Sequence, residues 1–161
     1  MNNTRLTINE NCLLKIDLDL IESNYKIMLK KISRNTVLSA VLKSNSYGLG
    51  LKYITEKLIS SGCKFFFLNS LNEAIYIRRI SKNSELFLLN GVIDSSSKNL
   101  KNIYENKISP VINSTEELYT IINFKKKYEK NINISLHFDT GINRLGIEIS
   151  KIKKIKDLCK L

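Results

Sequence analysis

The stretch AVLKSNSYGLG, residues 40–50, places Lys43 directly after an apolar run and before a polar turn that holds Tyr47 and two glycines. An amine at the carboxyl end of a strand, with a low-dielectric wall behind it, can lose its proton and act as a nucleophile that forms Schiff bases. The tyrosine can donate its hydroxyl to an anion. The glycines free the backbone before a helix expected to begin near Leu51, whose amino end favours negative charge. An aldehyde cofactor that carries a phosphate would use both halves of this arrangement.

Plainer interpretations of the same stretch stay open at this point. Most lysines pack the stem and extend the ammonium group into water, and a Gly-x-Gly turn alone is weak evidence of phosphate binding. Tyr47 would then be only an aromatic residue of a turn. The elements around the stretch decide between these interpretations.

The chain from Thr36 to Asp139 alternates short apolar runs with segments of helical period, which is typical of strand and crossover-helix units around a parallel sheet. The predicted strands are TVLSAVL, CKFFFLN, ELFLLN, SPVIN and INISLHF. Helical spacing of apolar residues begins near Leu51, Leu71, Leu100 and Leu118. The pairs Ser70–Glu73 and Ser114–Glu117 have the pattern of a capping box at two of these helix starts. We therefore predict an α/β fold with a parallel sheet and crossover helices.

Two flanking segments extend this array. CLLKIDLDL, residues 12–20, alternates apolar and polar residues as a strand with one buried face would, and Ile21 and Tyr25 continue at helical spacing. This first unit is expected at an edge of the sheet. After the last predicted strand comes the turn-rich segment TGINRLGIEIS, and then a basic helix that starts near Lys151.

Polar residues follow every predicted strand of the array. In sheets of this kind the chemistry gathers outside the carboxyl ends of the strands. The residues that fall there are Lys43 and Asn45, Asn69 and Ser70, Asn90 and Gly91, Asn113 and Ser114, and Asp139 to Arg144. The sequence therefore predicts a site at this edge, with Lys43 as one of its members.

The composition favours one soluble domain. The chain has 161 residues, of which 43% are hydrophobic, and it has neither an apolar run long enough to span a membrane nor the pattern of a signal peptide, so we expect a cytoplasmic protein without a membrane partner. A net charge of +11 would ordinarily suggest nucleic acid. The lysines, however, are scattered over predicted helix faces, so a basic nucleic-acid-binding domain is the weakest of the interpretations and no nucleic acid partner is expected.

The residues that most often bind metals or form disulfides lack the spacing for either. Cys12, Cys63 and Cys159 are odd in number and far apart, and His137 is the single histidine. We predict buried or idle thiols and no metal site.

Two motifs in the right order resemble those of the alanine racemases. AVLKSNSYGLG is similar to the family's pyridoxal-phosphate lysine motif, and LHFDTGINRLGIE is similar to its Asp-Thr-Gly-x-x-Arg-Leu-Gly segment. Weaker similarity extends over SSGCKFFFLNSLNEAIYIRR and CLLKIDLDLIESNYKIM. The resemblance implies the first part of a (β/α)8 TIM-type barrel. On this expectation residues 1–161 are the amino-terminal, partial-barrel domain and the family's carboxyl-terminal β domain is absent, because a complete barrel needs about 250 residues.

The resemblance also implies roles for three residues. Lys43 falls on the lysine that binds pyridoxal 5'-phosphate covalently and serves as the base toward the α-proton of D-alanine. Tyr47 falls on the tyrosine that contacts the cofactor phosphate, and Arg144 on the arginine near the cofactor's phenolic oxygen and the substrate carboxylate. The implied enzyme is a cytoplasmic isomerase that interconverts L-alanine and D-alanine, a peptidoglycan precursor, as a homodimer when full length.

The sequence departs from the family pattern at two places. His137 stands where the family commonly has a lysine that becomes carbamylated, and Leu49 replaces the usual histidine of the lysine motif. Histidine cannot form that carbamate. A neutral His137 that hydrogen-bonds the surroundings of Arg144, loss of the tuning, and a packed histidine without a role all stay open.

The family's second acid/base group is a tyrosine of the β domain, so we expect the isolated 161-residue chain to be inactive in racemisation. A partial barrel leaves a strand edge and its interior exposed, so we also expect the isolated chain to be poorly soluble. The alternatives are a non-catalytic pyridoxal-phosphate-binding barrel protein of the homeostasis type, or the remnant of a decayed gene.

Overall fold

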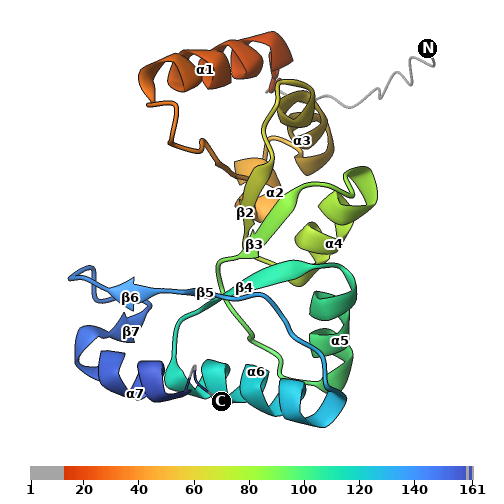
Figure 1. Ribbon diagram of the computed structural model, residues 1–161. Coiled ribbons are helices and arrows are strands. Elements are labelled where there is room, and N and C mark those ends of the chain that lie inside the picture. The colour runs from red at the N-terminus through yellow and green to blue at the C-terminus, as the bar shows by residue number, and fades with distance from the viewer. Residues whose placement is uncertain (1–12, 159, 161) are drawn as a thin grey trace.

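The main sheet is parallel, and its strands follow one another in the order of the sequence. The computed structural model of the protein describes residues 13–158 and 160. The sheet order is β1-β2-β3-β4-β5. The strands are β1 (Ala40–Val41), β2 (Phe65–Leu68), β3 (Glu85–Leu88), β4 (Ile108–Ile112) and β5 (Ser135–Leu136). Each overlaps one of the five predicted apolar runs, so the predicted parallel α/β architecture, the first part of a TIM-type barrel, is confirmed (Figure 1).

Helices connect the strands and follow one another along one side of the curved sheet (Figure 1). The helices are α1 (Leu18–Lys31), α2 (Lys43–Tyr47), α3 (Leu51–Ser60), α4 (Leu71–Ile80), α5 (Ser97–Glu105), α6 (Thr115–Tyr128) and α7 (Ile152–Leu158). After β5 the chain forms a small parallel pair, β6 (Phe138–Asp139) with β7 (Ile147–Glu148), and a 3-10 turn, η1 (Ile149–Lys151), leads into α7. The predicted turn-rich segment and basic helix are thus confirmed.

The two faces of the sheet are both apolar but unequally buried. Phe66 and Leu68 of β2 are completely buried in the core. The alternate residues Phe65, Phe67 and Phe87 point to the opposite face, where they are half-buried, and the rings of Phe67 and Phe87 stack with centroids 4.7 Å apart. The second face has the apolar character expected of a barrel interior.

The predicted strand over residues 12–20 is wrong for the part that the structure describes. Residues 13–17 pair with no described strand, and α1 begins at Leu18. Asp17 is the reason, because its Oδ1 accepts the backbone N–H groups of Asp19 and Leu20. An aspartate that caps a helix start in this way favours the helix over an extended strand.

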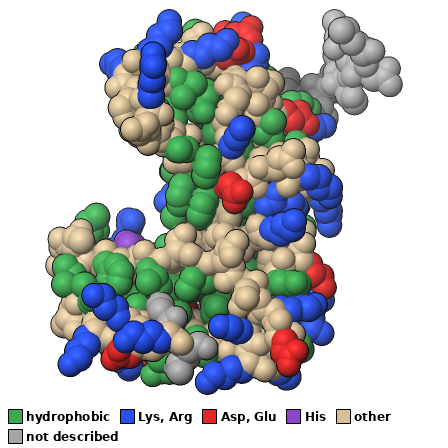
Figure 2. Space-filling model, viewed as in Figure 1, with side chains coloured by type: hydrophobic (Ala, Val, Ile, Leu, Met, Phe, Trp, Pro, Cys, Tyr) green, Lys and Arg blue, Asp and Glu red, His purple; other side chains and the backbone are tan. Residues whose placement is uncertain are grey.

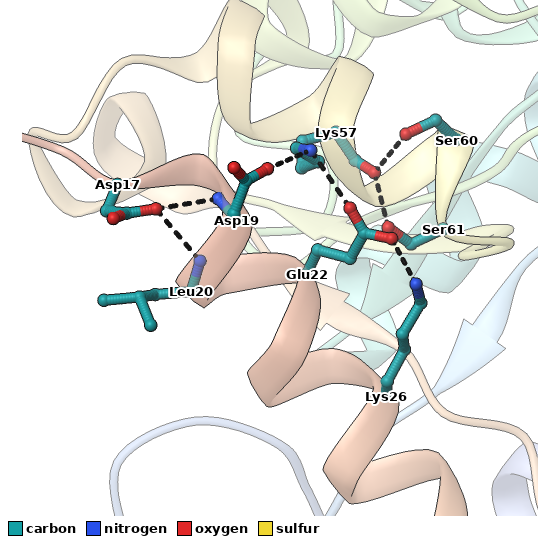
Figure 3. Close-up of polar contacts among 8 residues, drawn as sticks. All are labelled: Asp17, Asp19, Leu20, Glu22, Lys26, Lys57, Ser60 and Ser61. Carbon is teal, nitrogen blue, oxygen red and sulfur yellow. Dashed lines mark hydrogen bonds and ion pairs between the residues drawn. The ribbon is translucent and has the colours of Figure 1, made fainter.

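Helix α1 packs against the core through the buried Tyr25 and the partly buried Leu18 and Ile21, and it forms ion pairs with α3. Tyr25 is buried, and burial together with the nearby Cys63 thiol raises its pKa to about 12. Lys57 Nζ of α3 lies 2.8 Å from Asp19 Oδ1 and 3.0 Å from Glu22 Oε2 of α1 (Figure 3). The hydrogen bonds to Asp19 and Glu22 raise the pKa of Lys57.

The two predicted capping boxes form differently. At α4, Ser70 Oγ accepts the N–H of Glu73 and the Glu73 carboxylate accepts the N–H of Ser70, so the box is complete. At α6, Ser114 Oγ accepts the N–H of Glu117 at 3.2 Å, but the Glu117 carboxylate accepts N–H groups of Asn113 and of Val92, which follows the neighbouring strand. The second serine is confirmed as a cap, and its glutamate has another role.

The burial of the one described thiol and the spread of surface charge agree with the expectations from the sequence. Cys63 is buried, and burial raises the pKa of its thiol. Cys12 and Cys159 lie outside the described residues. Within residues 13–158 no helix has the length and apolar composition needed to cross a bilayer. On the face shown in Figure 2, lysine and arginine side chains are spread from one end of the molecule to the other.

Glycine at position 91 is required by the approach of Glu117. Gly91 has φ +63°, and a Cβ there would overlap Glu117 Oε2 and lie 2.8 Å from the carbonyl oxygen of Val111. Gly62 has φ +94° but open space around it.

We expect Gly91→Ala to lower the free energy of unfolding by about 2–4 kcal/mol and Gly62→Ala by about 1 kcal/mol, measured by urea unfolding. Equal losses would contradict the steric role of Glu117.

Glu73 and Glu117 should give opposite pH dependences of stability. Burial raises the pKa of Glu73, but N–H donors including Asn45 outweigh it, so its pKa is lowered. Burial outweighs the longer bonds to Glu117, so its pKa is raised. The contribution of Glu73 is present above the unfolded pKa and lost as pH falls through the folded pKa. The contribution of Glu117 is present below the unfolded pKa and lost as pH rises through the folded pKa.

We therefore expect the stability difference between wild type and Glu73→Gln to grow as pH rises from about 3 to about 6, a range that brackets the ordinary pKa of glutamate. The difference between wild type and Glu117→Gln should shrink over the same range. Urea unfolding at stepped pH measures both, and slopes of the same sign would show that one of the two assignments is wrong.

Candidate active site

A cavity lined by a lysine, a histidine and an arginine lies at the carboxyl ends of the strands. It has a volume of about 560 Å³. Its wall is formed by residues that follow β1, β2, β3 and β5, by residues within β4 and β6, and by the turn after β6. They are Lys43, Asn69, Asn90, Val111, His137, Asp139, Thr140 and Arg144, among apolar side chains such as Phe67, Leu89, Leu136 and Leu145. The structure therefore has a cavity at the edge of the sheet where the sequence predicts a site.

A larger cavity, of about 680 Å³, opens at the amino ends of β3 and β4. Its one buried cation, Arg78, donates hydrogen bonds to the carbonyl oxygens of Ser81, Lys82, Asn106 and Lys107. Four of the five N–H donors of this guanidinium are thus used in joining the ends of two β/α units. We assign the candidate site to the smaller cavity, because it holds the lysine and the arginine that the sequence singles out.

Lys43 is followed by a left-handed turn. Residues 44–47 all have φ between 54° and 56°, so α2 is not a right-handed helix. Each non-glycine residue in this conformation costs about 1–2 kcal/mol. Strain of this kind persists where the surroundings over-determine it, and it gathers at functional sites. The sequence predicted a polar turn here but not its handedness.

Asn45 fixes the turn with three groups. Its N–H donates to Glu73 Oε1 at 2.9 Å, its carbonyl oxygen accepts the N–H of Gly50 at 3.0 Å, and its side-chain Oδ1 accepts the N–H of Leu51 at 2.8 Å. The last bond ties the turn to the start of α3. It also occupies the first N–H of that helix, so this amide is not available to a phosphate.

Tyr47 stands apart from the cavity. Its side chain is 61% exposed and does not belong to the cavity wall. Its ring centroid lies 5.9 Å from Lys43 Nζ, a cation–π distance. The structure thus brings Lys43 and Arg144 to one cavity and leaves Tyr47 beside the lysine, outside the wall.

Arg144 is carried by a turn that Asp139 organises. Asp139 Oδ1 accepts the N–H of Gly141 at 2.9 Å and of Asn143 at 3.1 Å. These bonds lower the pKa of the Asp139 carboxyl, so it stays ionised and keeps the turn closed at neutral pH. The Asp-Thr-Gly part of the motif therefore has a physical purpose, which is to place the exposed arginine on the cavity wall.

His137 is oriented by a neighbouring strand end. Asn113 Nδ2 donates to the carbonyl oxygens of Leu89 at 3.1 Å and Val111 at 2.8 Å. Its Oδ1 is therefore turned toward His137 Nδ1, 2.8 Å away. The neutral imidazole must carry its proton on Nδ1, which leaves Nε2 as an acceptor. Asn113 is a site residue that the sequence reasoning placed only by its position after a strand.

The comparisons with known proteins agree on one family. Residues 16–161 match the family described as alanine racemase, N-terminal domain. The chain is 31% identical over 153 residues to the alanine racemase of Rickettsia akari and 32% identical to that of Rickettsia prowazekii. Each alignment covers 92% of this chain but 42% and 37% of those proteins.

Solved structures give the same result. The alanine racemase of Bartonella henselae with covalently bound pyridoxal phosphate is similar with a TM-score of 0.79 and 29% identity, over 88% of this chain and 40% of that one. The alanine racemase of Acinetobacter baumannii, with a TM-score of 0.76 and 24% identity over 90% of this chain and 40% of that one, supports the fold alone. The chain spans about two fifths of the length of these relatives.

The bond between Asn113 and His137 predicts one imidazole tautomer. In ¹⁵N NMR spectra recorded where His137 is neutral, we expect Nδ1 to be the protonated nitrogen. Asn113→Ala removes the acceptor, and the imidazole should then exchange between both tautomers. Asn90→Ala is the control, because Asn90 lines the same cavity without bonding to the imidazole. A proton on Nε2 in the wild type would contradict the network.

Proposed function

We propose, since the chain belongs to the family of the alanine racemase N-terminal domain, that it provides the cofactor lysine and the carboxylate-binding arginine of an enzyme that interconverts L-alanine and D-alanine. The observation that supports this most is the meeting of Lys43 and Arg144 on one cavity at the carboxyl edge of the sheet. Alanine as the substrate, pyridoxal 5'-phosphate as the cofactor and a homodimer as the complete enzyme all belong to the proposal.

The residues of the cavity fit pyridoxal phosphate. Among the described residues no carboxylate lies within ion-pair distance of Lys43 Nζ, so the amine is not held by a salt bridge. Leu89, Val111 and Leu136 offer apolar surface to an aromatic ring. Arg144 offers a cation to an anionic oxygen. Tyr47, beside Lys43, is proposed to donate its hydroxyl to the phosphate.

The chemistry follows from what racemisation needs. The α-proton must leave one face of the substrate and return to the other, so two acid/base groups on opposite sides are required. Bound pyridoxal phosphate supplies the electron sink that stabilises the carbanion. Lys43 moves the proton on one face, and Arg144 holds the substrate carboxylate by paired N–H donors, which fixes the substrate in the cavity.

His137 has a supporting place in this proposal. It shares the cavity wall with Arg144 and is bonded to Asn113. Its Nδ1–H donates to the amide oxygen of Asn113, so the imidazole is held in one orientation on the cavity wall that it shares with Arg144.

Covalent capture of the cofactor tests the proposal. The protein is incubated with pyridoxal phosphate, treated with borohydride, digested and analysed by mass spectrometry. We expect the label on the peptide that contains Lys43 and its loss in Lys43→Ala. Lys52→Ala is the matched control, because Lys52 is exposed on α3 and lies over the Tyr53 ring, 5.5 Å from its centroid, rather than on the cavity wall. Label spread evenly over surface lysines in both variants would contradict the assignment.

The activity is tested by exchange of the α-proton of alanine in heavy water, followed by NMR. A single base on one face predicts that D-alanine exchanges faster than L-alanine, and that Lys43→Ala abolishes the difference. Full interconversion by these 161 residues alone is not expected, because Lys43 serves one face. Capture at Lys43 without any exchange would favour a non-catalytic pyridoxal-phosphate-binding protein instead.

A further inference from the structure

Glu73 binds backbone amides that follow two different strands. It is the third residue of α4, and its Oε2 accepts the N–H groups of Ser70 at 3.1 Å and Asn69 at 3.3 Å after β2. Its Oε1 accepts the N–H of Asn45 at 2.9 Å, in the turn that follows β1. One half-buried carboxylate thus joins the lysine turn to the next β/α unit.

The amide that Glu73 holds lies inside the strained segment. Asn45 is the second of the four left-handed residues after Lys43. Among the described residues, its N–H has this carboxylate as its one hydrogen-bond partner. Without the carboxylate that amide would lose its acceptor, and a hydrogen bond to a charged acceptor is stronger than one between neutral groups. The left-handed residues would then relax toward commoner conformations, and the Cα of Lys43 would turn with them.

We propose that Glu73 is a positioning residue for Lys43, holding the left-handed turn so that the lysine side chain faces the cavity. The proposal rests on the proposed function of Lys43 as the cofactor lysine. Glu73 acts through the backbone of Asn45 and does not itself belong to the cavity wall.

Comparison with Glu117 distinguishes this role of Glu73 from ordinary helix capping. It is likewise the third residue of its helix, and its carboxylate likewise accepts amides after two strands, from Asn113 at 3.3 Å and Val92 at 3.4 Å. No lysine of the cavity wall lies in the turns that it holds. Loss of either carboxylate removes a comparable set of bonds, and only loss of Glu73 should affect Lys43.

The first experiment compares Glu73→Gln with Glu117→Gln in binding of pyridoxal phosphate, followed by the visible absorbance of the bound cofactor. A glutamine can accept the Asn45 amide or the amides after β2, but its Nε2 cannot accept the other set. We expect Glu73→Gln to weaken the apparent affinity about tenfold or more, and Glu117→Gln to change it by less than about twofold, since tenfold corresponds to about 1.4 kcal/mol. Equal effects of the two variants would overturn the proposal.

The second experiment needs no cofactor and tells the two proposals apart. Competitive acylation of lysines and amide hydrogen exchange, both followed by mass spectrometry, report on Lys43 and on the turn over residues 44–47. We expect Glu73→Gln to change the acylation rate of Lys43 and to speed exchange of the turn about tenfold or more, with Lys52 as the internal reference. This result in a wild type that captures no cofactor would support the positioning role while the proposed function fails. An unchanged Lys43 would overturn the role.

Glu73→Asp is a second variant that keeps the test decisive if Glu73→Gln does not fold. Glu73→Asp keeps the charge close to the Ser70 amide of its own helix, but it is one methylene too short to reach Asn45 as well. We expect it to remain folded by circular dichroism and to show the same loosening of the turn. Wild-type behaviour of Glu73→Asp in both experiments would count against the proposal.

Discussion

Carboxylates that accept backbone N–H groups from neighbouring strand ends hold the carboxyl edge of this sheet together. A parallel sheet leaves the amides after each strand without ladder partners at the point where the chain turns into a helix, and such groups need acceptors. Glu73 takes amides that follow β1 and β2, and Glu117 takes amides that follow β3 and β4. Through these bonds each loop after a strand keeps its place relative to the next.

The lysine turn shows what this bonding makes possible. Four successive left-handed residues would not persist in a free loop. Here Asn45 is held at its amide, its carbonyl and its side chain, so the turn has one conformation although its residues disfavour it. Glycine in this turn would relieve the strain, but it would also give the backbone next to Lys43 more conformational freedom. A strained turn of ordinary residues is the more rigid support for a reactive side chain.

The sequence predicted the architecture because apolar runs and helical spacing are local signals. All five strands of the sheet and the helices α3, α4, α5 and α6 were found in this way, as was the edge that carries Lys43 and Arg144. The strand prediction failed for residues 13–20, the part that the structure describes, because Asp17 fits an alternating strand as well as it fits a helix cap. Only the neighbours of a strand decide between the two. The bonds from Glu117 to Val92 and from Asn113 to His137 join residues 24 or 25 positions apart. No local pattern encodes such pairs.

The contacts that attach α1 to the core affect how its local unfolding depends on salt concentration. The helix contacts the rest of the fold through buried Tyr25, the partly buried Leu18 and Ile21, and the ion pairs of Lys57. Leu20, Ile27 and Met28 remain exposed. Salt screens exposed ion pairs but not buried apolar contacts. Within the described chain we therefore expect α1 to separate from the core more easily as ionic strength rises, whereas the sheet with its buried core should respond little.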